Sequence, residues 1–307
     1  MKRLDAHAFG LINGLDGSKV EDVNKQFRSA TFRYSIITLV TLAWSCLAFS
    51  GEIHDAAKAG DVTKITILLK ENPSLVSSKD AKEATPLHYA AYKGNKDVVA
   101  LLIANKADVN AKADGEITPL HFAALKNAKE VVLMLLDNNA EINAKDNNGR
   151  TPLFNASSRG NKETVELLLA HNADINVRDN EGRSAMHFAV LGDTKDAVVA
   201  LLAHKLDVNI KASDGMTPLH LAASSGNYAA AELLLANKAN VNETDKNGVS
   251  ALFLAAVSGN DKILKLLIAN KADVNAKGNN GMTPLSGAML KKQTAVVELL
   301  RQNGGHE

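Results

Sequence analysis

Apolar residues recur along most of this chain at helical spacing, in a short stretch followed by a longer one. In the first clear copy, Leu87 and Ala91 fall on one face of a helix that Gly94-Asn95 should end. Residues 96–104 then carry an apolar stripe wider than a lone surface helix needs. The pattern therefore predicts a pair of helices, the second of which is enclosed between neighbouring copies.

The tetrapeptide Thr85-Pro86-Leu87-His88 opens this pair of helices. Thr85 can cap the helix, and Pro86 suits the first helical position because its missing N–H costs nothing there. A fixed period of this kind is typical of a solenoid, in which each repeat contacts only its neighbours. The tetrapeptide returns, whole or altered, every 33 residues, at Thr118, Thr151, Ser184, Thr217, Ser250 and Thr283.

The combination of Thr-Pro-Leu-His-x-Ala-Ala, Gly-Asn, Leu-Leu and Ala-Asp-Val-Asn resembles the ankyrin-repeat family over about residues 52–304. The resemblance implies an all-α solenoid of helix-turn-helix units with projecting β-hairpin loops, such as residues 109–115. It also implies a concave face that binds other proteins, and no chemistry by itself.

The period divides the chain into a leader and a repeat array. Residues 51–84 form a degenerate N-terminal capping repeat, which is more charged, as an end facing water should be. Six full repeats fill residues 85–282, and residues 283–307 form a C-terminal capping repeat.

Residues 1–50 predict an export signal. Basic residues up to Arg33 precede an uncharged stretch, residues 34–51, and small residues end at Ser50, where cleavage is expected. The predicted location is therefore periplasmic or secreted. An uncleaved membrane anchor with the repeats outside is the alternative, because acidic Glu52 follows the stretch. Cys46 also suggests a lipoprotein signal, but the residues before it fit that pattern poorly.

Composition changes this picture little. Thirty-five Lys and Arg residues against 34 Asp and Glu residues leave a net charge of +1, which gives no sign of a nucleic-acid-binding protein. Hydrophobic residues make up 46% and aromatic residues 4%, so the core should consist of small and aliphatic side chains. The single cysteine, Cys46, leaves the repeats unable to form a disulfide.

Recurring histidines are the main candidate for chemistry. Equivalent residues on packed helices lie ~8–10 Å apart, whereas zinc needs each imidazole nitrogen at ~2.0–2.1 Å. A structural role is therefore predicted, and in ankyrin-like repeats this histidine bonds the hairpin region. No catalytic or phosphate-binding motif is present, so neither an enzyme nor a cofactor is predicted. The histidines are His88, His121, His187 and His220.

The repeats differ most where the first helix ends, at the positions that face the concave groove in this family. The N-terminal half offers large apolar groups and cations there, which suit a protein partner with an acidic or mixed surface. The protein itself is expected to be a monomer. The alternative explanation is that these positions simply hold ordinary exposed residues. The candidate residues are Tyr92, Lys93, Leu125, Lys126, Ser158, Arg159 and Leu191.

A basic column on the predicted hairpins is a weaker candidate, because neighbouring aspartates can neutralise it. It consists of Lys112, Lys145, Arg178, Lys211 and Lys277. A membrane-anchored envelope protein and a secreted effector remain alternative functions.

The repeat that begins at Thr151 departs from the pattern at two adjacent positions. Phe154 occupies the histidine position, and Asn155 stands where Tyr89, Phe122 and Phe188 stand elsewhere. If Asn155 is buried it needs a hydrogen-bond partner, because an unpaired amide costs ~1–3 kcal/mol.

Overall fold

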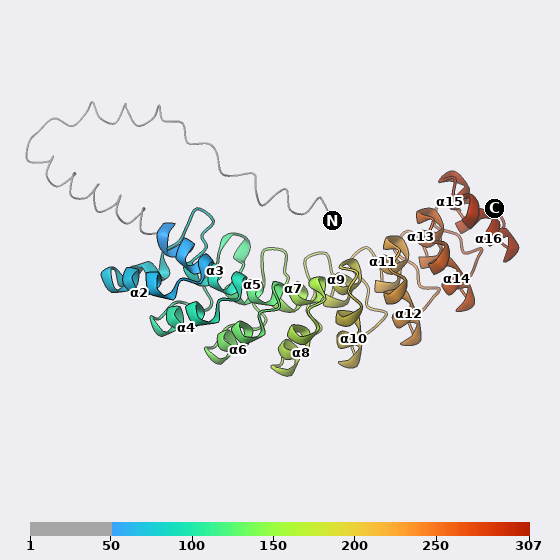
Figure 1. Cartoon of the computed structure of the whole chain (residues 1–307). Coiled ribbons are helices and arrows are strands. Elements are labelled where there is room, and N and C mark those ends of the chain that lie inside the picture. Colours follow the sequence, from blue (N-terminus) through green and yellow to red (C-terminus); the bar gives the residue numbers. More distant parts are fainter. Residues whose placement is uncertain (1–50) are drawn as a thin grey trace, which may run out of the picture. The chain divides into compact units, whose positions relative to one another are not determined.

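The computed structural model describes residues 51–307, which form helices and loops, with no strand in that range. Residues 1–50, with the predicted signal, the alternative anchor and Cys46, lie outside the described residues. The helices stack in two rows (Figure 1). None of the helices in residues 51–307 is both long and apolar enough to cross a membrane.

One row, here called the inner helices, holds the first helix of each repeat. Each helix begins directly after the predicted N-cap residue, including Ser184 and Ser250, which lack the following proline. These helices are α3 (Pro86–Lys93), α5 (Pro119–Leu125), α7 (Pro152–Arg159), α9 (Ala185–Leu191), α11 (Pro218–Ser225), α13 (Ala251–Ser258) and α15 (Pro284–Leu290).

The second row, here called the outer helices, holds the second helix of each repeat. The prediction for residues 96–104 is confirmed by α4. In the first unit, a helix over residues 51–59 precedes α2, and a 3-10 turn, η3 (Pro73–Ser77), follows it. The outer helices are α2 (Val62–Glu71), α4 (Lys96–Ala104), α6 (Lys129–Asp137), α8 (Lys162–Ala170), α10 (Lys195–Ala203), α12 (Tyr228–Ala236), α14 (Asp261–Ala269) and α16 (Thr294–Gln302).

The turn between the two helices needs a left-handed residue. Gly94 supplies it after α3, with φ 72°. Asn127 and Asp193 occupy the same position in later repeats with φ 57° and 53°, as expected of side chains that tolerate this conformation.

Small and aliphatic side chains form the core between the rows, in agreement with the composition. Leu87, Ala90 and Ala91 of α3 are completely buried, at 0% exposure. Burial of one such leucine contributes about 1.5–3 kcal/mol. The alanines let the inner helices approach closely, so surface differences between repeats arise at the remaining positions.

The loops that precede each inner helix project from the stack (Figure 1). The predicted hairpins reverse the chain, but within residues 51–307 they carry only two isolated bridges, Ala113 with Ile117 and Thr244 with Ser250. Single backbone hydrogen bonds join each loop to the next, such as Asn147 N–H to Gly115 O at 2.8 Å. One backbone hydrogen bond per loop holds neighbouring loops side by side, but these bonds do not form the ladder of a β-sheet.

Candidate binding surface on the inner helices

Each recurring histidine forms a bridge between two repeats. Thr85 N–H donates to His88 Nδ1 at 3.0 Å, and His88 Nε2 lies 3.0 Å from Ile117 O in the next loop. Because a carbonyl only accepts, Nε2 carries the proton and the ring is neutral. The predicted structural role is confirmed. The equivalent pairs are His121 with Arg150 O, His187 with Met216 O and His220 with Val249 O.

Burial controls the protonation of these histidines. Desolvation lowers the pKa of His88 and of His187 to about 4, although the backbone carbonyls oppose the shift. Burial likewise lowers the pKa of His121 and His220. Within residues 51–307, no three His, Cys, Asp or Glu side chains are placed to hold a metal ion.

The repeat that begins at Thr151 lacks this bridge, since Phe154 replaces the histidine. The Thr151 hydroxyl is buried without a hydrogen-bond partner in the described part of the chain. Phe154 instead packs edge-on against Phe188, with ring centroids 5.3 Å apart. Asn155 is half-buried, and its Nδ2 donates to His121 O at 3.2 Å, so this amide has a hydrogen-bond partner.

The candidate residues lie at the eighth and ninth positions of successive repeats, counted from the N-cap residue. Tyr92 and Leu125 are half-buried, whereas the cations beside them are exposed. Tyr92 packs edge-on against Phe122 with centroids 5.5 Å apart, and Lys126 Nζ lies 4.4 Å from the centre of the Tyr92 ring. The aromatic pair therefore supports a cation at the surface. Ser158 is half-buried, and Lys93, Arg159 and Leu191 are exposed.

From the sequence, the fifth position was described as apolar or aromatic and was assigned no part in binding, although residues there contribute to this surface. Tyr89 O–H donates to Asp80 Oδ2 at 2.5 Å, and Lys58 Nζ lies 4.3 Å from the centre of the Tyr89 ring. Burial raises the pKa of Asp80, but hydrogen bonds from Tyr89 and the backbone outweigh it, so the pKa lies below its usual value. Leu290 continues the eighth-position column and is 70% exposed.

The basic loop column is largely engaged within the protein. Lys112 pairs with Glu116, and Lys211 Nζ lies 2.6 Å from Glu243 Oε1. Arg178 Nη1 donates to Gly182 O at 3.0 Å. Lys145 and Lys277 form no salt bridge within residues 51–307. Three of the five cations are thus held by their own chain.

A second cluster surrounds the carboxylate of Asp179, whose side chain is 1% exposed. Arg183 Nε and Nη2 donate to Asp179 Oδ2 at 3.0 and 2.9 Å, and Arg150 Nε lies 3.6 Å from the same oxygen. Both guanidinium groups stack on Phe188, with Cζ 4.8 and 5.0 Å from its centroid. No sequence motif announces this cluster, because its members come from successive loops.

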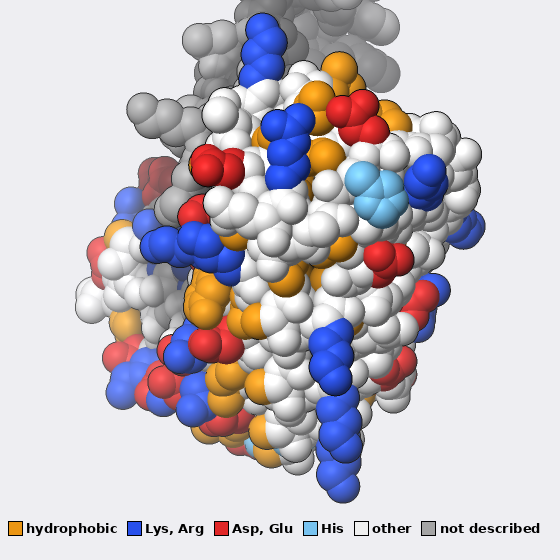
Figure 2. Space-filling view, turned by 90° about the vertical axis from the view of Figure 1, so that its right-hand side faces the viewer, with side chains coloured by type: hydrophobic (Ala, Val, Ile, Leu, Met, Phe, Trp, Pro, Cys, Tyr) orange, Lys and Arg blue, Asp and Glu red, His pale blue; other side chains and the backbone are white. Residues whose placement is uncertain are grey.

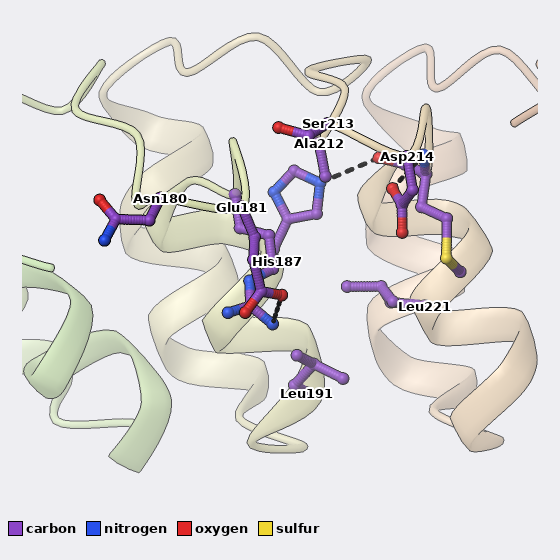
Figure 3. Close-up of a pocket in the computed structure, with 10 residues that line it drawn as sticks. Asn180, Glu181, His187, Leu191, Ala212, Ser213, Asp214 and Leu221 are labelled. Atoms are coloured by element: carbon purple, nitrogen blue, oxygen red, sulfur yellow. Dashed lines mark hydrogen bonds and ion pairs between the residues drawn. The ribbon is translucent and has the colours of Figure 1, made fainter. Parts of the chain in front are cut away.

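A cavity of about 460 Å³ opens between α9 and α11 (Figure 3). Glu181 stands on one side, and Leu221 of α11 lies opposite it. It is lined by Asn180, Glu181, Arg183, His187, Leu191, Ala212, Ser213, Asp214, Met216 and Leu221. Of the predicted partner-binding residues, only Leu191 lies at this cavity.

Hydrophobic side chains also reach the surface at the C-terminal end of the stack. Figure 2 faces that end and shows them between lysine, arginine, aspartate and glutamate side chains. Charges of both signs lie close together on that face, in keeping with the balanced composition.

Comparison with known proteins agrees with the architecture. Models of ankyrin repeats, each spanning three copies, match residues 53–146, 114–179, 138–214, 194–278 and 219–307, so the chain belongs to the ankyrin-repeat family. A Caenorhabditis elegans protein, "Transient receptor potential cation channel subfamily A member 1 homolog", is 34% identical over 95 residues. This match covers 31% of the present chain and 7% of that relative, so the chain spans a small fraction of its length.

Proposed function

We propose that this ankyrin-repeat chain is a non-enzymatic scaffold that binds a protein across the inner helices α3, α5 and α7. The observation that carries the proposal is the row formed by Tyr92 and Leu125 with three exposed cations, Lys93, Lys126 and Arg159. Aromatic and arginine anchors contribute most of the energy of protein interfaces. The cations favour a partner whose surface is acidic or mixed.

Affinity capture from the native compartment, followed by mass spectrometry, tests this site. A variant with Tyr92→Ala, Leu125→Ala, Lys93→Ser, Lys126→Ser and Arg159→Ser should lose the partner that the wild-type chain captures. Capture should also weaken as salt is raised, because exposed charges are screened. Unchanged capture by this variant would refute the assigned site.

A matched control is available on the outer helices, where the same side-chain types are exposed. It must be equally well folded and must retain the partner. The control changes are Tyr228→Ala, Leu133→Ala, Lys96→Ser, Lys129→Ser and Lys195→Ser.

The location is a separate part of the proposal, and it depends on residues 1–50. The order of basic, uncharged and small residues supports cleavage after Ser50 and export of the repeats. N-terminal sequencing of the processed chain should give Gly51-Glu52-Ile53. An intact N-terminus in a membrane fraction would instead favour the anchored alternative.

A further inference from the structure

The cavity between α9 and α11 occurs where the aromatic filling of the inner-helix surface ends. At two other junctions between inner helices an aromatic ring at the fifth position occupies this space, as Phe122 does beside Tyr92 and Phe188 does beside Phe154. The remaining repeats carry Asn155, Leu254 and Gly287 at the fifth position. In the repeat that begins at Thr217 the fifth residue is Leu221, which is shorter. The space beside it is left open to a ligand.

The close contact on the other side of α9 explains why that helix does not close the gap. A Cβ atom at Gly192 would lie 2.2 Å from Ser158 O, a distance that no side chain tolerates. Glycine therefore lets the end of α9 lie against the end of α7. Leu191, the preceding residue, remains 48% exposed at the cavity.

Apolar side chains and carboxylates line the cavity together, with Glu181 and Asp214 on opposite sides of it. Leu191, Met216 and Leu221 supply aliphatic surface, and the loops supply the Glu181 and Asp214 carboxylates (Figure 3). Apolar surface beside carboxylates suits a long aliphatic side chain that ends in a cation.

The only cationic side chain among the lining residues, Arg183, already forms ion pairs within the chain. Arg183 donates to Asp179, and its Nη1 lies 2.8 Å from Glu181 Oε2. Asp214 forms no salt bridge with any residue in the range 51–307. Its Oδ1 accepts only the Met216 N–H, at 2.9 Å. The lining thus holds two carboxylates and one guanidinium, and Asp214 is the carboxylate without an ion-pair partner in the described residues. Arg178 lies beside the cavity, where its Nη1 donates to Gly182 O.

We infer that this cavity binds a lysine or arginine side chain of the protein partner. The inference rests on the proposed function and deepens it, because it predicts which way round the partner lies along the inner helices. Cations at Lys93, Lys126 and Arg159 favour acidic groups of the partner, and Glu181 with Asp214 favour a basic one. A partner docked in the reverse direction would meet like charges at both places.

The spacing of the helices sets the distance between these two features of the partner. Arg159 lies at the end of α7, and the cavity lies between α9 and α11. At ~10 Å per helix the separation is roughly 15 Å, the reach of four or five residues of extended chain.

Three probe peptides test the cavity on the full chain: acetyl-Gly-Leu-Lys-Leu-Gly-amide and its analogues with norleucine or glutamate in place of lysine. Methyl NMR signals of Leu191, Met216 and Leu221 report binding. The lysine peptide should shift them saturably and bind about three- to fivefold more tightly than the norleucine peptide, the range of an exposed ion pair. The glutamate peptide should bind most weakly.

Asp214→Asn with Glu181→Gln should reduce the lysine preference to less than about 1.5-fold. The asparagine keeps the oxygen that accepts the Met216 N–H, so the loop should hold its conformation. The matched control, Asp196→Asn with Glu232→Gln on outer helices, should leave the preference unchanged.

Norleucine binding as tight as lysine would overturn the inference in favour of a purely apolar site. Preferred binding of the glutamate peptide, or no methyl shift with any peptide, would also overturn it. The capture experiment alters α3, α5 and α7 only, so the two proposals fail separately.

Discussion

Two parts of the inner-helix surface share one backbone plan but present different surfaces. Over α3 and α5, Tyr92 and Phe122 fill the space between the helices, and Lys126 rests on the Tyr92 ring. Between α9 and α11, Leu191 and Leu221 leave a cavity with carboxylates at its edge. In these two parts the fifth and eighth residues decide whether the groove is filled or open, and the ninth residues and the loops decide the sign of its charge.

What the two parts share is the histidine bridge. His88 joins α3 to the following loop in the filled part, and His187 does the same beside the cavity. Both rings are neutral donors at Nε2 and acceptors at Nδ1. A second proton would remove the acceptor, so acid should weaken both parts together.

The largest expected effect is therefore a loss of stability in acid. The folded pKa of His88 and His187 is about 4, below the unfolded value of ~6.5, so the unfolded chain binds more protons between those values. Stability is complete above pH ~6.5 and should fall by on the order of 5 kcal/mol for the two residues by pH ~4.5. Urea denaturation at a series of pH values measures this.

Glutamine provides the control for that experiment, because its amide can donate to the same carbonyl without titrating. The double variant His88→Gln and His187→Gln should be less stable at pH 7 but lose less stability on acidification. An unaltered pH slope would show that other groups control acid unfolding.

A smaller loss of stability is expected when Phe122 in the filled part is replaced by leucine, the residue that occupies the fifth position beside the cavity. Phe122→Leu removes the ring that contacts Tyr92 at 5.5 Å and His88 at 6.1 Å. Half-buried aromatic area and two edge contacts are lost, so the free energy of unfolding should fall by about 1–1.5 kcal/mol. Chemical denaturation measures the change, and no change would mean that the ring contributes only to the surface.

The converse substitution should have the smallest effect on stability. Leu221→Phe places an aromatic ring where the cavity lies and should raise the free energy of unfolding by about 0.5 kcal/mol, as moderate cavity filling does. It should also abolish the methyl shifts that the lysine peptide causes at Leu191. Retained shifts would mean that the probe binds elsewhere.

Most of the fold could be predicted from the sequence because each repeat encodes its own boundaries. Thr85 with Pro86 marks where α3 begins, and Gly94 marks where it ends, by local backbone chemistry alone. For Asn155 the sequence predicted a partner only on the condition of burial, and it could not identify that partner, His121 O, which is 34 residues away.

The site was less predictable because its contacts join different repeats. Lys126 stacks on Tyr92, and Arg150 approaches Asp179. Each of these contacts joins two successive repeats, so it cannot be seen within one repeat. The cavity at Leu221 arises from missing volume, which leaves no residue pattern to find. Such features depend on how neighbouring surfaces meet in three dimensions.

The hydrogen bonds that cross between repeats have a consequence for how such a chain can grow. Asn161 Nδ2 donates to Ala124 O and Asn260 Nδ2 to Ala223 O, each 37 residues back, and the histidine bridges reach 29 residues ahead. A 33-residue segment that holds both the histidine and the asparagine therefore carries one donor and one acceptor for each kind of bridge. Gene duplication or deletion of such a segment would leave its flanking repeats paired, whereas segments with Phe154, Phe253 or Ala128 lack one of the donors.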